Sequence, residues 1–349
     1  MPLELVAVGP RQPELREYET IPPGPGEVLI RSVLATEKHG TDLAFYRGHT
    51  PFSHQTFDPE HGLFMPLDSP DPAPWAGPRP LGNMTIGVVE QVGSDVIDLS
   101  AGDRVYGYLP IRETHTVAAG HLHRAPDDIS NDALICLDPA LVAYTAVRET
   151  HGLLGELVAV FGLGAIGLMT LQLAKIAGAS FIVAVEPLAL RAELGRKYGA
   201  DVVLDLANDR DAGLQVRQVT GMTGVDVALE TSGSHQALHH AIRGTRYGGA
   251  IVPVAWYHGE AAGLRLGEEW HFNRQTLISG GRLESVPYRD HPRWDIPRVQ
   301  ESVLRLLASG RLSVEGMLQP RVPMAEAAEA YRLIDEHPEQ CVKLAVEFG

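Results

Sequence analysis

A short glycine-rich turn stands between an apolar run and a helix-like run in the middle of the chain. Residues 158–161 are apolar, and the sequence continues Gly162-Leu163-Gly164-Ala165-Ile166-Gly167. In this Gly-x-Gly-x-x-Gly pattern, Gly162 permits a tight turn, Gly164 lets backbone N–H groups approach a pyrophosphate, and Gly167 lets the helix lie close on the strand. The helix N-terminus also favours the phosphate charge. The pattern predicts a dinucleotide site that includes Ala165 and Ile166.

An acidic residue follows this turn at the distance that such a site requires. Glu186 lies at the end of a second apolar run, residues 181–185. A carboxylate there binds a ribose 2′-hydroxyl and repels a 2′-phosphate. The residues that directly follow are Pro, Leu, Ala and Leu, so the nearest cation is Arg191. We therefore expect the cofactor to be NAD, although a glycine-rich turn without a ligand is the alternative.

The composition narrows the classes of protein that the chain can be. Its 349 residues are enough for two domains. It has no apolar run of eighteen residues, and its N-terminus lacks the basic start and apolar stretch of a signal peptide. The net charge of −15 argues against nucleic-acid binding. The only cysteines, Cys136 and Cys341, are too few for a disulfide framework. We expect a cytoplasmic protein with a small-molecule substrate and neither nucleic-acid nor membrane partners.

The elements that must position the glycine turn form an alternating pattern. From about 131 to 278, strand-like and helix-like runs alternate, which predicts an α/β fold with a doubly wound parallel sheet. We expect strands at 158–162, 181–185, 202–204, 226–229, 250–254 and 276–279, and helices at 140–152, 166–178, 188–198, 210–220 and 235–244. Residues 1 to about 130 are predicted to be mainly β, with a long irregular segment over 48–80. After residue 280 we expect helices at 296–309 and 324–336 and a strand at 342–347.

Further motifs occur in a familiar order along nearly the whole chain. They are Gly40-Thr41-Asp42, Gly102-Asp103-Arg104-Val105, Gly199-Ala200-Asp201, Gly248-Gly249 and Lys343. With the glycine turn, this order resembles the medium-chain dehydrogenase/reductase superfamily, which has the zinc-type alcohol dehydrogenase fold. The resemblance implies a GroES-like β domain formed by residues 1–130 and 279–349, and a Rossmann domain formed by residues 131–278. It also implies a catalytic cleft at the domain junction and a homodimer or homotetramer.

The chain departs from this family where the zinc members bind their metal. They carry Cys where this chain has His39, and Gly-His-Glu where it has Gly82-Asn83-Met84; their third ligand falls near Asp138. The four-cysteine structural zinc loop is missing. Catalytic zinc needs three N, S or carboxylate ligands, and Asn83 is a poor one, so we expect no catalytic metal. The chain is similar to the zinc-lacking branch that contains the bacteriochlorophyllide hydroxyethyl dehydrogenases.

Without zinc, a side chain must take the proton that an alcohol loses on oxidation. The resemblance places Thr41 at the family's proton-relay hydroxyl, and the ordinary pKa of histidine, about 6.5, suits His39 to shuttling a proton. Lys38 could stabilise an alkoxide, and Asp138 could raise the pKa of His39. The alternatives are a turn hydroxyl for Thr41, a hydrogen-bonded structural histidine for His39, a solvated Lys38 and a helix N-cap for Asp138.

The resemblance also assigns the rest of the cofactor site. It places Val142 beside the nicotinamide, Thr231 and Ser232 near the adenosine, and Val254 and Ala255 along the nicotinamide ribose. Candidate substrate contacts are Tyr46, His49, His54, Trp75, His115 and Trp256, which favour a sugar or cyclic polyol. We expect an NAD-dependent oxidoreductase that acts on a secondary alcohol. The alternatives are a zinc-free NADPH quinone or enone reductase and a non-catalytic NAD-binding protein.

Overall fold

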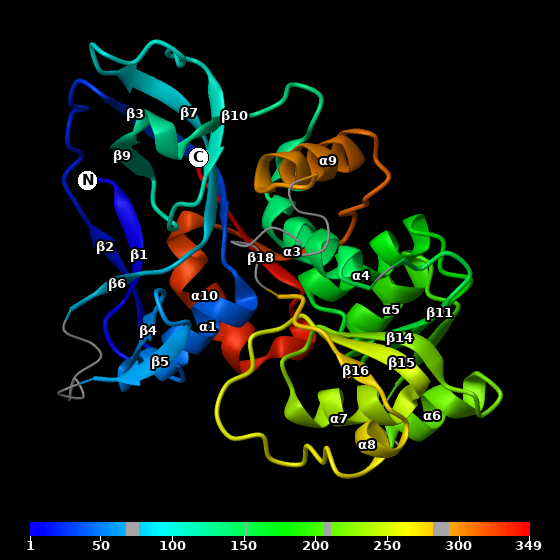
Figure 1. The fold of residues 1–349 in the computed structure, drawn as a ribbon. Coiled ribbons are helices and arrows are strands. Elements are labelled where there is room, and N and C mark those ends of the chain that lie inside the picture. The colour runs from blue at the N-terminus through cyan, green and yellow to red at the C-terminus, as the bar shows by residue number, and fades with distance from the viewer. Residues whose placement is uncertain (68–76, 151, 206–210, 282–292) are drawn as a thin grey trace. The chain divides into compact units, whose positions relative to one another are not determined.

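The computed structural model describes residues 1–67, 77–150, 152–205, 211–281 and 293–349. The chain forms two compact units (Figure 1). The first unit contains Met1–Asp127, Pro320–His337 and Lys343–Gly349, and the second contains Asp128–Gln319 and Pro338–Val342. We expected residues 279–349 to join the first unit, but α9 (Ile296–Ala308) belongs to the second, where it contacts α3 (Leu137–Arg148). Amphipathic periodicity shows that a helix has an apolar face, but it does not show what covers that face.

A seven-stranded sheet organises the first unit. Its order is β10-β8-β7-β3-β18-β17, with β9 also paired to β3. Val28 and Ile30 of β3 pack on Val89 and Val105 from neighbouring strands, as expected for alternating apolar residues on one sheet face. The strands are β3 (Glu27–Thr36), β7 (Met84–Val92), β8 (Arg104–Gly107), β9 (Thr114–Ala118), β10 (His123–Arg124), β17 (Leu318–Pro323) and β18 (Lys343–Glu347).

Two smaller sheets and two helices complete this unit. The segment 48–80, expected to be irregular, contains regular secondary structure, because β4 and β5 form a hairpin within it. Residues 68–76, which include Trp75, lie outside the described residues. Helices α1 and α10 meet through Tyr46 and Tyr331, whose ring centroids are 5.2 Å apart. The elements are β1 (Leu3–Ala7), β2 (Pro13–Glu17), β6 (Arg79–Pro80), β4 (Gln55–Asp58), β5 (Leu63–Pro66), α1 (His39–Arg47), α10 (Ala327–Glu336) and the short 3₁₀ turns Pro51–Ser53, Ala119–His121 and Met324–Glu326.

The second unit contains a six-stranded sheet, and all the strand pairings among its described residues are parallel. The order β13-β12-β11-β14-β15-β16 is that of a Rossmann sheet, so the expected doubly wound α/β fold is confirmed. Phe161, Val183 and Ile251 of three different strands pack with Val216 and Ile242 of two helices. The strands are β11 (Leu157–Phe161), β12 (Phe181–Val185), β13 (Val202–Leu204), β14 (Val225–Glu230), β15 (Thr245–Pro253) and β16 (Thr276–Leu277).

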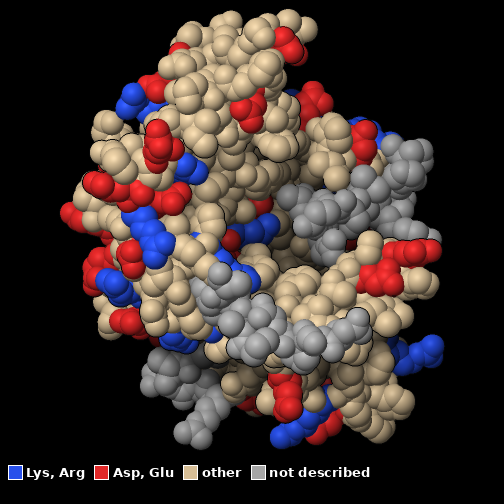
Figure 2. All heavy atoms as spheres, turned by 90° about the vertical axis from the view of Figure 1, so that its left-hand side faces the viewer, with Lys and Arg blue, Asp and Glu red and all other residues tan. Residues whose placement is uncertain are grey.

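Helices precede, connect and follow these strands along the chain (Figure 1). Besides α3 and α9 they are α2 (Asn131–Leu134), α4 (Ala165–Ile176), α5 (Ala189–Lys197), α6 (Ala212–Val219), α7 (His235–Gly244) and α8 (Glu269–Phe272), with a 3₁₀ turn at Pro338–Gln340. Within the described ranges, none of the helices has the length and apolar character to cross a bilayer. On the face that Figure 2 shows, acidic and basic side chains are intermixed.

Candidate functional site

The glycine turn joins β11 to α4, and close contacts require its glycines. Gly162 has φ of 84°, a left-handed conformation that favours glycine, and a Cβ there would lie 2.8 Å from the Ser232 Cβ. A Cβ on Gly167 would lie 1.9 Å from the carbonyl oxygen of Gly162. Gly164 is the N-cap of α4, and the nearest atom to its notional Cβ, apart from its chain neighbours, is 3.9 Å away. The turn is therefore closed behind Gly162 and Gly167 and open beside Gly164, the arrangement that a pyrophosphate needs.

The Glu186 carboxylate is bonded to this turn. Its Oε2 accepts a hydrogen bond from the Leu163 N–H at 2.6 Å, and its Oε1 accepts one from the Leu188 N–H at 2.9 Å. Glu186 is buried, and burial raises its pKa against the lowering effect of those two N–H groups. The position at the end of β12 places an acid next to the glycine turn, where a ribose hydroxyl would need it.

A cation also lies beside the turn. Arg191 donates from Nε to the carbonyl of Cys341 at 2.8 Å and from Nη2 to that of Pro338 at 3.3 Å. Its Nη1 is the atom 3.9 Å from the notional Cβ of Gly164. The sequence shows the arginine, but its position beside the glycine turn depends on two carbonyl groups about 150 residues away in the chain.

Sequence reasoning missed Glu230, the residue that shapes the neighbouring loop. Glu230 ends β14, is fully buried, and accepts hydrogen bonds from the Ser232 N–H at 2.8 Å, from the Gly233 N–H at 3.2 Å, and from the Ser232 and Tyr257 hydroxyls. Burial raises the pKa of this carboxyl group despite these donors. The signal for it in the sequence is an apolar strand that ends in an acid.

The loop after Glu230 contacts both the glycine turn and the segment that follows β15. The Thr231 hydroxyl donates to the Gly162 carbonyl at 2.7 Å. The Val254 N–H donates to the Glu230 carbonyl at 2.7 Å, and the Ala255 Cβ lies 3.4 Å from a notional Cβ on Gly233. These residues follow β14 and β15, whose carboxyl ends lie at one edge of the sheet because the strands are parallel.

Helix α3 carries Val142 and Asp138. Both side chains are buried, at 3% exposure each. Asp138 is the second residue of α3 and the N-cap is Cys136, so the alternative in which Asp138 caps the helix is wrong. The helix begins earlier than the expected residue 140, because Pro139 fits within its first turn.

In the first unit, three candidate catalytic residues lie at the start of α1. Lys38 is the N-cap, His39 is the first residue of the helix, and Thr41 is the third. Asp42 accepts a hydrogen bond from the Lys38 N–H at 2.9 Å, which fixes this first turn. Among the described residues, the half-buried Thr41 hydroxyl makes no hydrogen bond, so the turn-hydroxyl alternative has no contact to support it.

A buried acid that we did not predict lies beside His39. Glu37 is fully buried, and its Oε1 is 3.5 Å from His39 Nδ1. Neither atom has a hydrogen-bond partner among the described residues. Thr36 donates its hydroxyl to the other oxygen, Oε2, at 3.0 Å, and Lys343 donates to the Glu37 carbonyl at 2.8 Å. Burial opposes ionisation of Glu37, but the Lys343 charge, and then His39, lower its pKa to about 2.

The donors expected of a catalytic zinc site are incomplete in this unit. At the position of the family's Gly-His-Glu motif, Asn83 is neutral, and Met84 is buried in β7. Glu37 and His39 are two donors, whereas catalytic zinc takes three from the protein. In the described part of the first unit, no set of three His, Cys, Asp or Glu ligand atoms comes within 4.8 Å. The residues of this unit therefore do not fit the metal by themselves.

The candidate substrate contacts have different surroundings. Tyr46 is buried against Tyr331, so it packs the core. His115 is also buried, and burial together with Arg112 lowers its pKa to about 3. His49 and His54 are exposed, and Trp256 lies edge-on against His258 in the second unit. Tyr46 and His115 therefore contribute to the folding of the first unit, and the exposed histidines His49 and His54 remain candidates for contact with a ligand.

The sheet order, the glycine turn and the acid that follows it define a dinucleotide-binding protein of the Rossmann type, joined to a β-rich unit. A family profile described as zinc-binding dehydrogenase matches residues 165–286. D-guloside 3-dehydrogenase of Escherichia coli is 40% identical over 351 residues, which cover 99% of each chain. (R,R)-butanediol dehydrogenase of Bacillus subtilis is 28% identical over 76% of this chain and 80% of that protein.

Solved structures agree with the fold. The crystal structure of 2R,3R-butanediol dehydrogenase from Bacillus subtilis superimposes with a TM-score of 0.76 at 24% identity, over 99% of both chains. The chain belongs to the medium-chain dehydrogenase/reductase superfamily and is an enzyme of it. The resemblance to the superfamily is thus confirmed, whereas the similarity to its zinc-lacking branch stays a prediction. The cofactor of the family is a nicotinamide dinucleotide.

Proposed function

We propose that this enzyme is an NAD-dependent dehydrogenase that interconverts a secondary alcohol and a ketone on a sugar or cyclic polyol without catalytic zinc. The relatives support this substrate class, since one is named D-guloside 3-dehydrogenase and another sorbitol dehydrogenase. The observation that carries the metal-free mechanism is the pair formed by Glu37 and His39 next to Thr41. The family resemblance assigns His39 to the position of the first metal ligand of the zinc members.

When bound, NAD would accept the hydride of the alcohol carbon, and residues of the second unit would hold it. Gly162, Gly164 and Gly167, with Ala165 and Ile166 between them, form the turn that would bind the pyrophosphate. Glu186 would accept hydrogen bonds from the adenosine ribose and disfavour a 2′-phosphate, which supports NAD over NADP. We also assign Thr231, Ser232, Val254, Ala255 and Val142 to cofactor binding, on the positions described above.

Residues of the first unit would accept the proton of the alcohol hydroxyl. His39 accepts the hydroxyl proton at Nε2, directly or through the Thr41 hydroxyl, while Nδ1–H points at the Glu37 carboxylate. Glu37 stays ionised because Lys343 is close, so it stabilises the imidazolium that forms. Lys38 stabilises the alkoxide as the proton leaves, and we also assign a catalytic role to Asp138, the buried acid of α3.

A substrate screen tests this proposal. Purified enzyme would be mixed with NAD and with methyl glycosides, cyclic polyols or open-chain secondary alcohols, and reduction followed at the nicotinamide absorbance. We expect turnover with pyranosides or cyclic polyols. Thr41→Val should lower kcat by about 10- to 100-fold with unchanged NADH affinity, and Thr41→Ser should restore much of it. Turnover with open-chain alcohols alone would refute the substrate class.

We also propose that the enzyme is cytoplasmic and forms a homodimer or homotetramer. Cys136 and Cys341 are buried thiols that do not form a disulfide, which suits a reducing compartment. The two-residue strand β16 ends the strand order of the second sheet, and such an edge can pair with another copy. Light scattering of the eluted protein tests the assembly, and a monomer at micromolar concentration would contradict it.

A further inference from the structure

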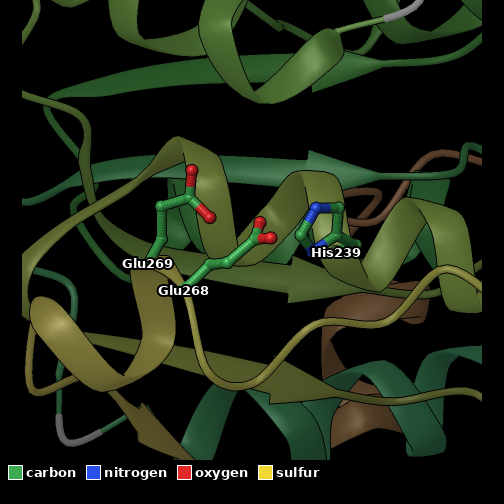
Figure 3. A group of neighbouring side chains, drawn as sticks. All are labelled: His239, Glu268 and Glu269. Carbon is green, nitrogen blue, oxygen red and sulfur yellow. The ribbon is translucent and has the colours of Figure 1, made fainter.

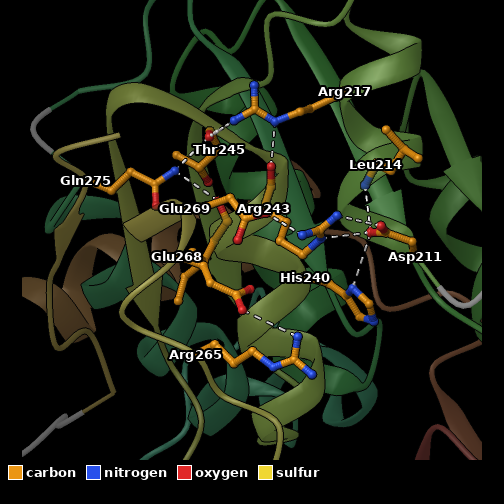
Figure 4. Close-up of polar contacts among 11 residues, drawn as sticks. Asp211, Leu214, Arg217, His240, Arg243, Thr245, Arg265, Glu268, Glu269 and Gln275 are labelled. Carbon is orange, nitrogen blue, oxygen red and sulfur yellow. Dashed lines mark hydrogen bonds and ion pairs between the residues drawn. The ribbon is translucent and has the colours of Figure 1, made fainter. Parts of the chain in front are cut away.

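A second polar cluster lies in the Rossmann unit, at the contact between α7 and α8. His239 comes from the middle of α7, while Glu268 and Glu269 stand at the start of α8. One ligand atom from each of the three lies within 4.8 Å of the other two. Figure 3 shows the Glu268 carboxylate directed toward the His239 ring, with Glu269 beside it. Figure 4 shows the polar contacts that surround the cluster.

Two atoms of this cluster are buried without a partner. His239 is only 9% exposed, and its Nδ1 makes no hydrogen bond to the described residues. The Oε2 atom of Glu269 is likewise buried and unbonded. Native proteins pair nearly all such atoms, and an imidazole nitrogen and a carboxylate oxygen can share one partner, a cation. The pair of unbonded atoms therefore indicates a ligand rather than a packing fault.

The surrounding charges leave the carboxylates partly uncompensated. Arg243 pairs with Glu269 Oε1, but it also donates to both oxygens of Asp211, at 3.2 Å and 2.7 Å. The Asp211 carboxylate therefore already balances the positive charge of Arg243. Arg265 is 66% exposed and reaches Glu268 only at 3.5 Å, a contact that solvent screens. Arg243 holds Glu269 through Oε1 and so orients the free Oε2, as outer partners of metal ligands do.

From these contacts we propose that His239, Glu268 and Glu269 bind a divalent zinc-type cation. One imidazole nitrogen and two carboxylate oxygens are ligands that zinc accepts, with water in the fourth position, whereas calcium and magnesium prefer oxygen alone. Ligand atoms of a tetrahedral zinc lie about 3.4 Å apart, and those of the cluster lie within 4.8 Å of one another, so no two of them need approach by more than about 1.4 Å. Glu268 can supply this movement, because its side chain is 46% exposed.

The site is separate from the proposed chemistry. It joins α7 to α8 and thereby fixes the end of the segment that leads from β15 to α8, just before β16. The role of the cation is to stabilise this part of the Rossmann unit, and neither the glycine turn nor His39 contributes a ligand to it.

Equilibrium dialysis of the full-length protein tests the site. Chelator-stripped protein would be dialysed against buffered zinc, and bound metal measured by mass spectrometry. We expect one zinc per chain in the wild type, and binding weakened at least about tenfold in Glu268→Gln and His239→Gln. Glu260→Gln, which removes an exposed acid from the same segment, should bind like the wild type. His39→Ala should also keep its zinc.

Two further readouts make the result decisive. Zinc should raise the melting temperature of the wild type and of Glu260→Gln but not of Glu268→Gln, a change at a half-exposed side chain that the fold tolerates. Cobalt substitution should give the absorption of a tetrahedral site in His39→Ala. No zinc in the wild type, full binding by Glu268→Gln, or loss of all zinc in His39→Ala would each overturn the proposal.

Discussion

Glu37 Oε1 and His39 Nδ1 lie 3.5 Å apart at the junction of β3 and α1, and neither has another partner among the described residues. The distance is slightly longer than an ordinary N–H···O hydrogen bond, and the carboxylate is completely buried. A small approach would make an acid–histidine pair of the kind that orients a general base. In the proposed metal-free mechanism, this pair orients the base.

Removal of the base and removal of the acid should have different effects. His39→Ala should lower kcat by about 10²- to 10⁴-fold, because a positioned base contributes that much. Glu37→Gln, which keeps the shape but not the charge, should lower kcat by about 10- to 100-fold and shift the pH profile of kcat/KM, with KM little changed. Glu37→Asp should recover part of the loss. A pH profile identical to that of the wild type in Glu37→Gln would show that Glu37 does not act through His39.

The depressed pKa of Glu37 predicts acid sensitivity. Its pKa falls from 4.5 to about 2 on folding, so its ionised form stabilises the native state above about pH 4.5, and this stability is lost as the pH falls through 2. The full difference is about 3 kcal/mol. The free energy of unfolding, from urea titrations between pH 6 and 3, should therefore fall more steeply in the wild type than in Glu37→Gln. The exposed Glu19→Gln is the control, and parallel curves for all three proteins would contradict the expectation.

Cofactor choice should depend on the Glu186 charge. Glu186→Gln removes the repulsion of a 2′-phosphate, so the ratio of the NADPH to the NADH dissociation constant should fall by about tenfold, to be measured by fluorescence titration. Because burial raises the pKa of Glu186, lower pH protonates it more readily and should reduce the preference in the wild type. A wild type that binds NADPH more tightly would show that Glu186 does not select NAD.

The glycine turn should not tolerate a side chain at Gly167. In Gly167→Ala the new Cβ would meet the Gly162 carbonyl at 1.9 Å, so α4 must move away from β11. We expect a loss of roughly 1–3 kcal/mol in stability and at least tenfold weaker NADH binding. Gly120→Ala is the matched control, because a Cβ there meets nothing within 4 Å. Equal melting temperatures and NADH affinities for the two variants would mean that the turn is looser than these contacts indicate.

Chelation should leave turnover intact. If the donor set at His39 binds no catalytic zinc, prolonged treatment with chelator should leave kcat unchanged within about twofold, even when it removes zinc from the α7–α8 cluster. Activity and bound metal would be measured on the same samples. Activity that disappears with the metal and returns with added zinc, in both wild type and His239→Gln, would establish a catalytic metal after all.

Local pattern was sufficient to predict the Rossmann sheet. The expected strands 158–162, 181–185 and 202–204 match β11, β12 and β13 to within one residue, and helix 235–244 matches α7. Buried parallel strands are continuous apolar runs, and their helices repeat every 3.6 residues, so both are visible in short windows. The β4–β5 hairpin was not visible, because its side chains are half or fully exposed and lack the apolar alternation of a buried strand.

The sequence by itself determined the family, the glycine turn and the acid Glu186, because each depends on residues close together in the chain. Tertiary structure alone decided that Glu37 is buried and charged, since Lys343 reaches it from 306 residues away, where β18 pairs with β3. It also decided that α9 joins the second unit and that His239 meets Glu268 and Glu269. Burial and charge pairing are properties of long-range contacts, and no local pattern records them.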